Sequence, residues 1–227
     1  MRAPRTVSYA ASFGNYGGLQ GLEPRWADGL RGFDALAVRD ERSRSLLRTA
    51  LGVEAELTLD PCLQFPLPPL RPGSNGRAPG RPYALVYGHN FGARFARQVR
   101  RWAAGRDLAL VSVGYRNEWA DEQWLDAGPH DFAALMAGAA AVATNFFHGC
   151  VFALRHETPF VCEPAPYRSA KILDLLAQVG GEEHLVGDGS SADAYAARLE
   201  EPVSARVLRA IERLRSSGEA YLEAALA

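Results

Sequence analysis

The stretch AAAVATNFFHGCVFAL at residues 139–154 decides the fold. Residues 140–144 are small and apolar, which is typical of a parallel strand that is buried on both faces. An apolar helix is predicted from Phe147 onward, so Thr144 and Asn145 form the turn between the carboxyl end of a strand and a helix start. Ligands of open α/β sheets bind at such turns, where the first helical N–H groups attract anions.

His148 lies in the first turn of this predicted helix. Its imidazole could serve as a general acid or base, or it could contact a bound anion. A helix amino terminus disfavours the charged ring, which leaves the neutral ring usable as a base near neutral pH. The alternative is a histidine that only caps a buried turn, and the local sequence favours neither. We expect Thr144, Asn145 and Gly149 to contact the same ligand, and Cys150 to belong to the core.

Strands and helices alternate along the rest of the chain. The predicted strands span residues 6–11, 33–38, 55–59, 83–87, 108–113, 140–144 and 159–162. The predicted helices span residues 24–30, 41–51, 93–104, 130–137, 147–155, 169–178 and 204–226. This alternation predicts an α/β protein with mostly parallel, Rossmann-like sheets covered by helices on both faces.

A change of composition divides the chain. Residues 61–82 are rich in Pro, Gly and Arg and lack periodicity, which predicts an irregular connection. We therefore expect a partial Rossmann-like segment at residues 1–62 and a linker at 63–82. A second Rossmann-like domain at 83–202 and a C-terminal helix at 203–227 complete the predicted organisation.

The composition excludes several classes of function. The net charge of −1 provides no field that would attract nucleic acid or an anionic membrane. The three cysteines and five histidines show no C-x-x-C or H-E-x-x-H spacing, so we expect neither disulfides nor a metal site. No apolar run reaches the roughly 18 residues that a membrane span needs. These features predict a cytoplasmic protein.

Arg39 is a second candidate for ligand binding. It follows the apolar residues 35–38, which are predicted to form a strand. A guanidinium can hold a phosphate or a carboxylate with two parallel hydrogen bonds. The alternative is a surface arginine that pairs with Asp40 or Glu41.

Two loops have polar groups that could bind a ligand. The Gly-rich loop at residues 12–21 follows the first predicted strand, and Ser12 and Gly14 are its candidate contacts. This loop matches neither the dinucleotide-binding nor the P-loop motif, so it could equally be a plain connection. The acidic, Trp-rich loop around Asp121 and Asp126 could hold sugar hydroxyls or form a solvated lid.

Four stretches of the sequence form an ordered set. They are SYAASFG at residues 8–14, AVRDERSRSLLRTALGVEAELTLDPCL at 37–63, GPHDFAALMAGAAAVATNFFHGCVFALRHETPFV at 128–161 and YRSAKILDLLAQVG at 167–180. Together the four resemble the polysaccharide pyruvyl transferase family. The resemblance implies a fold similar to two-domain GT-B glycosyltransferases. It also implies the transfer of a pyruvyl group from phosphoenolpyruvate to sugar hydroxyls, which forms a ketal and releases phosphate without a further cofactor.

The resemblance also implies roles for single residues. The family's motif histidine falls on His148, which is expected to exchange a proton with the enol carbon or the acceptor hydroxyl. The arginine of its V-R-[DE] segment falls on Arg39, which is expected to hold the donor's phosphate or carboxylate. Arg168 and Lys171 are expected to contact substrate, although members often have Arg in place of Lys171. Some members also have Arg where this chain has Phe146.

The amino terminus departs from the family pattern. Members usually carry most of a Rossmann-like half before the SYAASFG element, which begins here at Ser8. We therefore expect a shortened or incomplete first domain. The missing half could come from another polypeptide or from a second copy in a homo-oligomer.

Three functions are compatible with these patterns. The first is pyruvyl transfer to a carbohydrate acceptor in bacterial surface-glycan or secondary-metabolite assembly. The second is glycosyl transfer from a nucleotide sugar by a GT-B enzyme, in which case a nucleotide diphosphate would stabilise the protein. The third is a truncated, non-catalytic partner subunit, which would expose an apolar patch near residues 6–11 or on the last helix.

Overall fold

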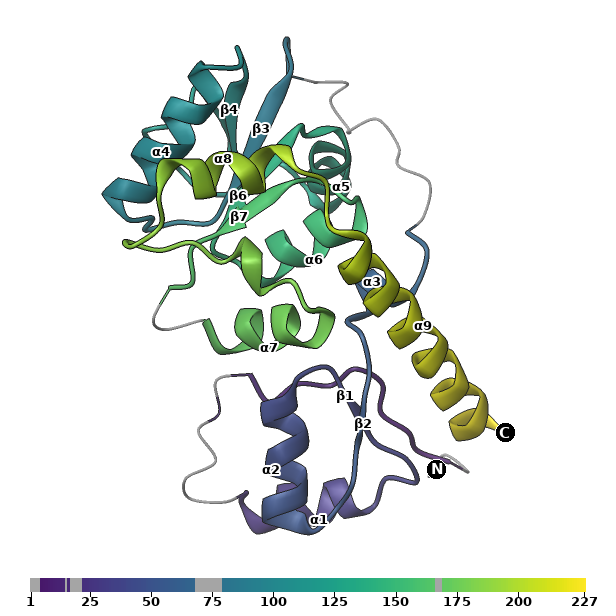
Figure 1. Ribbon diagram of the computed structural model, residues 1–227. Helices are drawn as coiled ribbons and strands as arrows, with labels where there is room; N and C mark the ends of the chain where they lie inside the picture. The colour runs from purple at the N-terminus through teal and green to yellow at the C-terminus, as the bar shows by residue number, and fades with distance from the viewer. Residues whose placement is uncertain (1–4, 15, 17–21, 68–78, 166–168) are drawn as a thin grey trace. The chain divides into compact units, whose positions relative to one another are not determined.

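A computed structural model describes residues 5–14, 16, 22–67, 79–165 and 169–227 (Figure 1). These residues form two compact units. Unit 1 comprises Met1–Phe65, Asp174–Gly180 and Arg206–Ala227, and unit 2 comprises Pro66–Leu173 and Gly181–Ala205. Each unit contains a parallel sheet with helices packed against it, which confirms the predicted α/β class.

Unit 1 has a small parallel sheet. Strands β1 (Ala37–Val38) and β2 (Glu56–Leu57) pair in parallel. The segment before them adds parallel bridges from Val7 to Ala35 and from Ala11 to Val38. Its helices are α1 (Pro24–Arg31), α2 (Glu41–Leu51), α3 (Pro61–Gln64), most of α7 (Ser169–Val179) and nearly all of α9 (Ala205–Leu226).

Local signals in the sequence explain the limits of α2. The side chain of Asp40 accepts a hydrogen bond from the Ser43 amide at 2.8 Å, which caps the amino terminus. Gly52 ends the helix in the left-handed conformation with φ of 63°, as the sequence predicts. Leu47 packs from this helix onto Val38 in the core of unit 1.

Helix α9 is attached to the start of the chain by long-range hydrogen bonds. The Tyr221 hydroxyl donates to the carbonyl oxygen of Ser8 at 2.6 Å. The side chain of Gln64 donates to the Arg215 carbonyl, and the Arg215 guanidinium donates to the Leu63 carbonyl. Unit 1 is therefore completed by residues from both ends of the sequence.

Unit 2 has a five-stranded parallel sheet with the order β5-β4-β3-β6-β7. Its strands are β3 (Tyr83–Tyr87), β4 (Ala109–Val113), β5 (Glu122–Trp124), β6 (Ala141–Thr144) and β7 (Phe160–Cys162). The chain builds outward from β3 to β5 and then returns to place β6 on the other side of β3. The carboxyl ends of β3 and β6 therefore flank a topological switch point, the usual place of ligands in such sheets.

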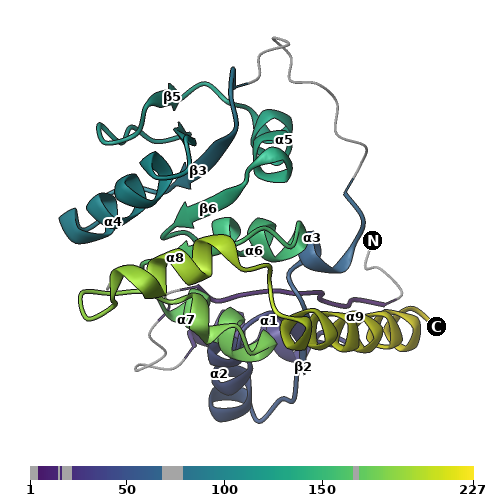
Figure 2. The same cartoon turned by 45° about the horizontal axis from the view of Figure 1, so that its top comes forward.

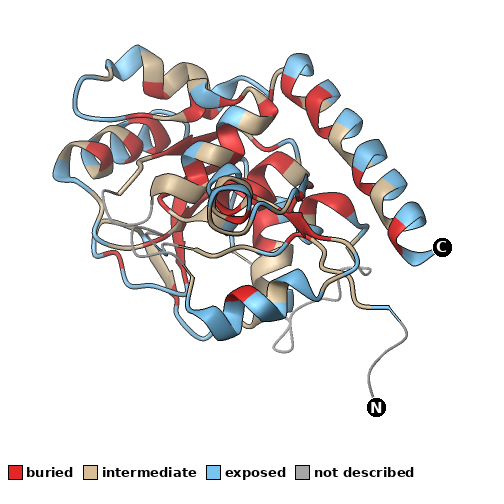
Figure 3. Cartoon of the chain, turned by 90° about the horizontal axis from the view of Figure 1, so that it is seen from below, coloured by how far each residue is buried: buried red, intermediate tan, exposed pale blue. Residues whose placement is uncertain are grey.

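Helices cover both faces of this sheet (Figures 1 and 2). Helices α4 (Ala93–Ala104) and α8 (Ala192–Glu200) pack on one face through Phe95, Val99 and Tyr195, among others. Helices α5 (Pro129–Gly138) and α6 (Phe147–Arg155) lie on the other face. Figure 3 shows buried residues along the strands and along the inward stripes of the helices, as amphipathic helices on an apolar sheet require.

The structure differs from the predicted elements at several places. Residues 6–11, which were predicted to form a strand, form isolated parallel bridges at Val7 and Ala11 instead. Strand β5 lies within the predicted Trp-rich loop, because Gln123 exchanges hydrogen bonds with the backbone of Asn117 and aligns a polar edge strand. Helix α3 begins where an irregular connection was predicted, with Asp60 as its cap. Helix α8, which the sequence analysis did not predict, is capped by Ser191.

Across the segments that the structure describes, no helix has both the length and the apolar character that a bilayer crossing needs.

His184 makes the stability of unit 2 depend on pH. Its ring stacks on Phe160 at 3.9 Å, and Nδ1 donates to the Phe160 carbonyl oxygen at 2.9 Å. Burial lowers the pKa of His184, although that hydrogen bond has the opposite effect. The pKa of His156 is also lowered, by its burial and by the positive charge of the nearby Arg155. The unfolded chain therefore binds more protons than the folded chain below the ordinary histidine value of about 6.5.

We expect the free energy of unfolding to be retained above this value and to fall as the pH drops through it. Urea denaturation at a series of pH values measures this dependence. The variant His184→Gln, whose side chain does not titrate, should show a shallower dependence. Equal slopes in the two proteins would refute the assignment to His184.

Candidate functional site

Hydrogen bonds join the turns that follow β6 and β3 in unit 2. The Thr144 hydroxyl donates to the carbonyl oxygen of Tyr87 at 2.7 Å and accepts from the Phe146 amide at 3.0 Å. The Asn145 side chain donates to the carbonyl oxygen of His89 at 2.8 Å. Thr144 and Asn145 are both buried, so these bonds fix the backbone on both sides of the switch point.

His148 is presented at this edge of the sheet. It is the second residue of α6, which begins directly after the buried turn, and its side chain is exposed. The residue at its N-cap position, Phe146, makes no side-chain capping hydrogen bond. An exposed imidazole in the first turn of a helix can transfer a proton or contact an anion.

Gly149 allows α6 to approach β6 closely. A Cβ atom at this position would lie 2.0 Å from Oγ1 of Thr144 and 2.7 Å from its Cβ. Gly88, after β3, has a φ of 143°, and its Cβ would lie 2.0 Å from Oδ1 of Asn145. The predicted contacts Thr144, Asn145 and Gly149 therefore shape the turn itself and set the position of His148.

An aromatic cluster lies beside the turn. The Phe146 ring makes edge contacts with Tyr87, His89 and Tyr115, with centroid distances of 5.2, 5.3 and 5.0 Å. Tyr115 follows β4 and is 37% exposed. Phe146 is therefore an apolar ring that supports the carboxyl ends of three strands.

Arg39 lies at the carboxyl edge of the sheet in unit 1. Its Nη1 atom is 2.8 Å from Oδ2 of Asp60, with side-chain exposures of 22% for Arg39 and 2% for Asp60. The Arg39 amide donates to the Ala11 carbonyl, so three parallel segments end together here. The alternative partners named from the sequence, Asp40 and Glu41, do not form an ion pair with Arg39 among the described residues: Asp40 caps α2 and Glu41 pairs with Arg44.

The start of the Gly-rich loop lies at the same edge of unit 1. The Gly14 amide donates to the Ser12 hydroxyl at 3.1 Å, and Gly14 has a φ of 66°. The Phe13 amide donates to the hydroxyl of Ser43, in the first turn of α2. Unit 1 therefore brings Ser12, Gly14 and Arg39 to one edge of its sheet.

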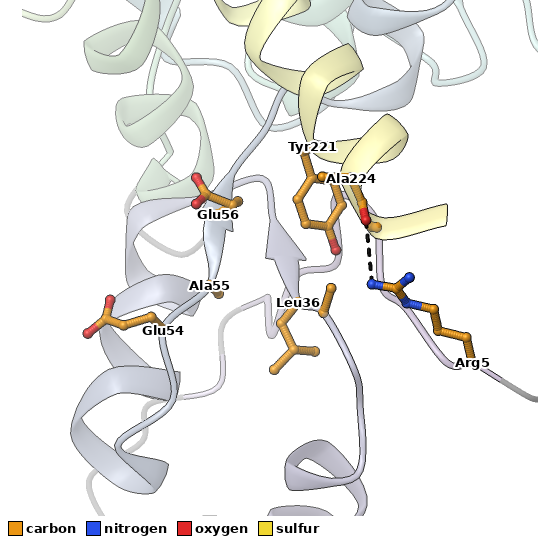
Figure 4. Close-up of a pocket in the computed structure, with 9 residues that line it drawn as sticks. Arg5, Leu36, Glu54, Ala55, Glu56, Tyr221 and Ala224 are labelled. Atoms are coloured by element: carbon orange, nitrogen blue, oxygen red, sulfur yellow. Dashed lines mark hydrogen bonds between the residues drawn. The ribbon is translucent and has the colours of Figure 1, made fainter. Parts of the chain in front are cut away.

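A pocket of about 300 Å³ lies at the opposite, amino edge of this sheet (Figure 4). Leu36 and Ala55 supply apolar walls, and Tyr221 and Ala224 of α9 close one side. The Arg5 guanidinium donates to the Ala224 carbonyl at 3.4 Å. This pocket lies at the other end of the strands from Arg39, so it is not part of the candidate site.

The remaining predicted contacts lie elsewhere. Lys171 is half-buried in the first turn of α7, and Arg168 lies outside the described residues. His148 belongs to unit 2 and Arg39 to unit 1. Among the residues with described positions, no group of three His, Cys, Asp or Glu side chains has an arrangement that could hold a metal ion.

Two acidic residues at the strand ends were not among the predicted site residues. Asp60 holds Arg39, and Glu163, which follows β7, accepts a hydrogen bond from the Gly92 amide at 2.8 Å. The sequence contained a signal for Asp60, since Asp followed by Pro is typical of a helix start. It contained none for Glu163, whose partner is 71 positions away.

Comparison with known proteins relates the chain to one family. The sequence profile of the family described as polysaccharide pyruvyl transferase matches residues 2–163. No curated protein matches the sequence at a significant level.

Solved structures share the fold at low sequence identity. A putative UDP-N-acetylglucosamine 2-epimerase from Listeria monocytogenes is 13% identical, with a TM-score of 0.51 over 96% of this chain and 68% of that one. UDP-GlcNAc 2-epimerase from Neisseria meningitidis, bound to UDP-GlcNAc, is 10% identical, with a TM-score of 0.50 over 96% of this chain and 62% of the epimerase chain. Glycosyltransferase SnogD from Streptomyces nogalater is 16% identical, with a TM-score of 0.41 over 85% of this chain and 63% of the SnogD chain.

The similarity to the two epimerases shows that this chain shares their fold. The chain spans less than two thirds of the Neisseria epimerase and of SnogD.

Gly149→Ala should destabilise unit 2. The added methyl group would overlap Thr144, whose branched, buried and hydrogen-bonded side chain cannot move aside. Overpacking of this kind costs about 1–3 kcal/mol of unfolding free energy. Urea denaturation measures the loss.

Gly105→Ala serves as the matched control. A Cβ at Gly105 would lie 3.6 Å from its nearest neighbours, which is ordinary contact, so we expect a change within about 0.5 kcal/mol. Equal stabilities of the two variants would contradict the close approach of α6 to β6.

Proposed function

Because the chain belongs to the polysaccharide pyruvyl transferase family, we propose that it transfers a pyruvyl group from phosphoenolpyruvate to a pair of sugar hydroxyls, as a ketal. The observation that carries this proposal is the exposed imidazole of His148 over a rigid turn at the switch point. Phosphoenolpyruvate combines a phosphate and a carboxylate with an enol carbon that must gain a proton. A helix start with a titratable ring suits both requirements.

The balance of the reaction defines what the protein must supply. Two acceptor hydroxyls lose their protons as their oxygens bond to the central carbon of the donor. One proton ends on the enol carbon, which becomes a methyl group, and the other ends on the departing phosphate. The protein therefore has to orient the donor and to move two protons, and it needs no redox chemistry.

His148 is proposed to give the enol carbon its proton. The adjacent turn supports this role, because Thr144 and Asn145 hold the start of α6 in place through buried hydrogen bonds. A fixed helix start limits the positions that the imidazole can take while its proton is transferred, and pre-organisation of this kind lowers the barrier.

Arg39 is proposed to bind the donor's phosphate or carboxylate. Asp60 is buried and holds one nitrogen of the guanidinium, which fixes the plane of the group. The side chain keeps 22% exposure at the carboxyl edge of unit 1. A planar, partly exposed guanidinium is the preferred protein group for gripping an oxyanion.

The test is phosphate release from phosphoenolpyruvate in the presence of candidate glycan acceptors. Thermal unfolding in the presence of phosphoenolpyruvate or of UDP distinguishes the donor class, because a ligand stabilises the state that binds it. If UDP stabilised the protein and phosphoenolpyruvate released no phosphate with any acceptor, the proposal would be contradicted and a nucleotide-sugar enzyme would be favoured.

His148→Ala should lower kcat by about 100-fold or more, since general acid–base catalysis contributes at least that much. The melting temperature should not change, because the side chain is exposed. The control is His130→Ala, which removes another exposed histidine from the second position of a helix, α5. Full activity in His148→Ala would rule out the proposed role.

Arg39→Lys should raise the KM for phosphoenolpyruvate about tenfold, the equivalent of one charge-assisted hydrogen bond of about 1.4 kcal/mol. Lysine keeps a positive charge near Asp60 but loses the planar fork. Arg81→Lys is the control, because Arg81 forms an exposed ion pair with Asp107. Steady-state kinetics with varied donor concentration measure the effect. An unchanged KM would place donor binding elsewhere.

A further inference from the structure

The side chain of Glu163 lies across the switch point of unit 2, between the turns that follow β7 and β3. It follows β7 directly, and its amide donates to the Thr144 carbonyl oxygen at 3.0 Å. Its carboxylate accepts from the amide of Gly92, the cap residue of α4, at 2.8 Å. Helix α4 follows β3, and β6 lies between β3 and β7. The side chain therefore passes over the carboxyl end of β6, where the turn to α6 begins.

The chain is built to accept this carboxylate closely. A Cβ atom at Gly92 would lie 2.7 Å from Oε1 of Glu163, so a larger residue at that position would displace it. The first βα turn of the sheet thus has a glycine where the acidic group crosses. The carboxylate is half-buried.

The surrounding groups are acidic, basic and phenolic. Asp188 lies on the segment before α8, Arg94 lies in the first turn of α4, and Tyr195 lies on α8. Burial raises the pKa of Glu163, and the charge of Asp188 adds to this effect, whereas the Gly92 hydrogen bond opposes it. Burial also raises the pKa of Tyr195 to about 12. Glu163 is therefore the group of this cluster that is suited to exchange a proton.

We propose that Glu163 is a second catalytic residue, which takes the proton of one acceptor hydroxyl. This inference rests on the proposed function, which requires two proton transfers for each ketal. The hydroxyl oxygen bonds to the central carbon of the donor as its O–H bond breaks, and the proton moves to the carboxylate. The carboxylic acid then gives that proton to the departing phosphate. His148 delivers the other proton to the enol carbon and regains it from the second hydroxyl.

Asp131 shows what a purely structural carboxylate looks like in this unit. It accepts the Gly128 amide at 3.1 Å and caps α5. Helix α5 follows the edge strand β5, and β4 and β3 separate that strand from β6. Each of the two carboxylates accepts a hydrogen bond from the amide of a helix cap residue, but only Glu163 also lies at the switch point.

Glu163→Gln tests the proposal. Glutamine can still accept the Gly92 hydrogen bond, but it cannot take up a proton. We expect kcat to fall about 100-fold, with the KM for phosphoenolpyruvate within about twofold of wild type. Wild-type kcat should decline at low pH as the carboxylate becomes protonated, and this decline should be absent from the variant's pH profile. Asp131→Asn, the matched control, should keep both the wild-type rate and the wild-type profile.

Glu163→Asp separates chemistry from folding. It keeps a carboxylate of shorter reach, and we expect its rate to exceed that of Glu163→Gln by about tenfold. If kcat fell equally in both variants and both kept the wild-type pH profile, Glu163 would have a structural role and the inference would be overturned. Wild-type activity in Glu163→Gln would overturn it while leaving the proposed function intact. A wild-type protein that releases no phosphate with any acceptor would refute the proposed function first.

Discussion

The hydrogen bonds that tie the end of β6 to the end of β3 are the constraint on which unit 2 depends. Thr144 and Asn145 are buried polar residues, and each donates a side-chain hydrogen bond to the carbonyl of the neighbouring turn. Both bonds require close approach, which Gly149 and Gly88 permit. Breaking either bond would leave a buried donor without a partner, which is costly, so the two bonds stabilise this arrangement of the turn. The turn therefore determines where α6 begins and where its second residue, His148, lies.

The two units have the same kind of sheet edge but carry different polar groups on it. In each, parallel strands end together and place polar side chains at the carboxyl edge. In unit 1 these groups centre on a guanidinium held by a buried carboxylate, which suits oxyanion binding. In unit 2 they are an imidazole and a half-buried carboxylate, which suit proton transfer. The family match extends over both edges, from residue 2 to residue 163.

Local patterns in the sequence predicted the elements that depend on local physics. Helix α2 has both its limits as predicted, because Asp40 and Gly52 act within one turn of the helix. Strand β5 was missed because its register depends on the side chain of Gln123 rather than on apolar alternation. Asp60 and Glu163 have hydrogen-bond partners 21 and 71 positions away, and only the folded chain identifies these pairings. The sequence pattern indicated the turn before His148, but it gave no sign that Glu163 would bind the Gly92 amide.

The interleaving of the two units has a consequence for biosynthesis. Unit 2 is nearly continuous in sequence and ends at Ala205, so its core can consolidate while the chain is still being made. Unit 1 needs contacts such as that between Tyr221 and Ser8, which are 213 positions apart. Closing so long a loop is slow, and it cannot begin before α9 has emerged from the ribosome. The nascent amino-terminal segment therefore remains incomplete until α9 has been synthesised, and premature termination before that point would leave it without this helix.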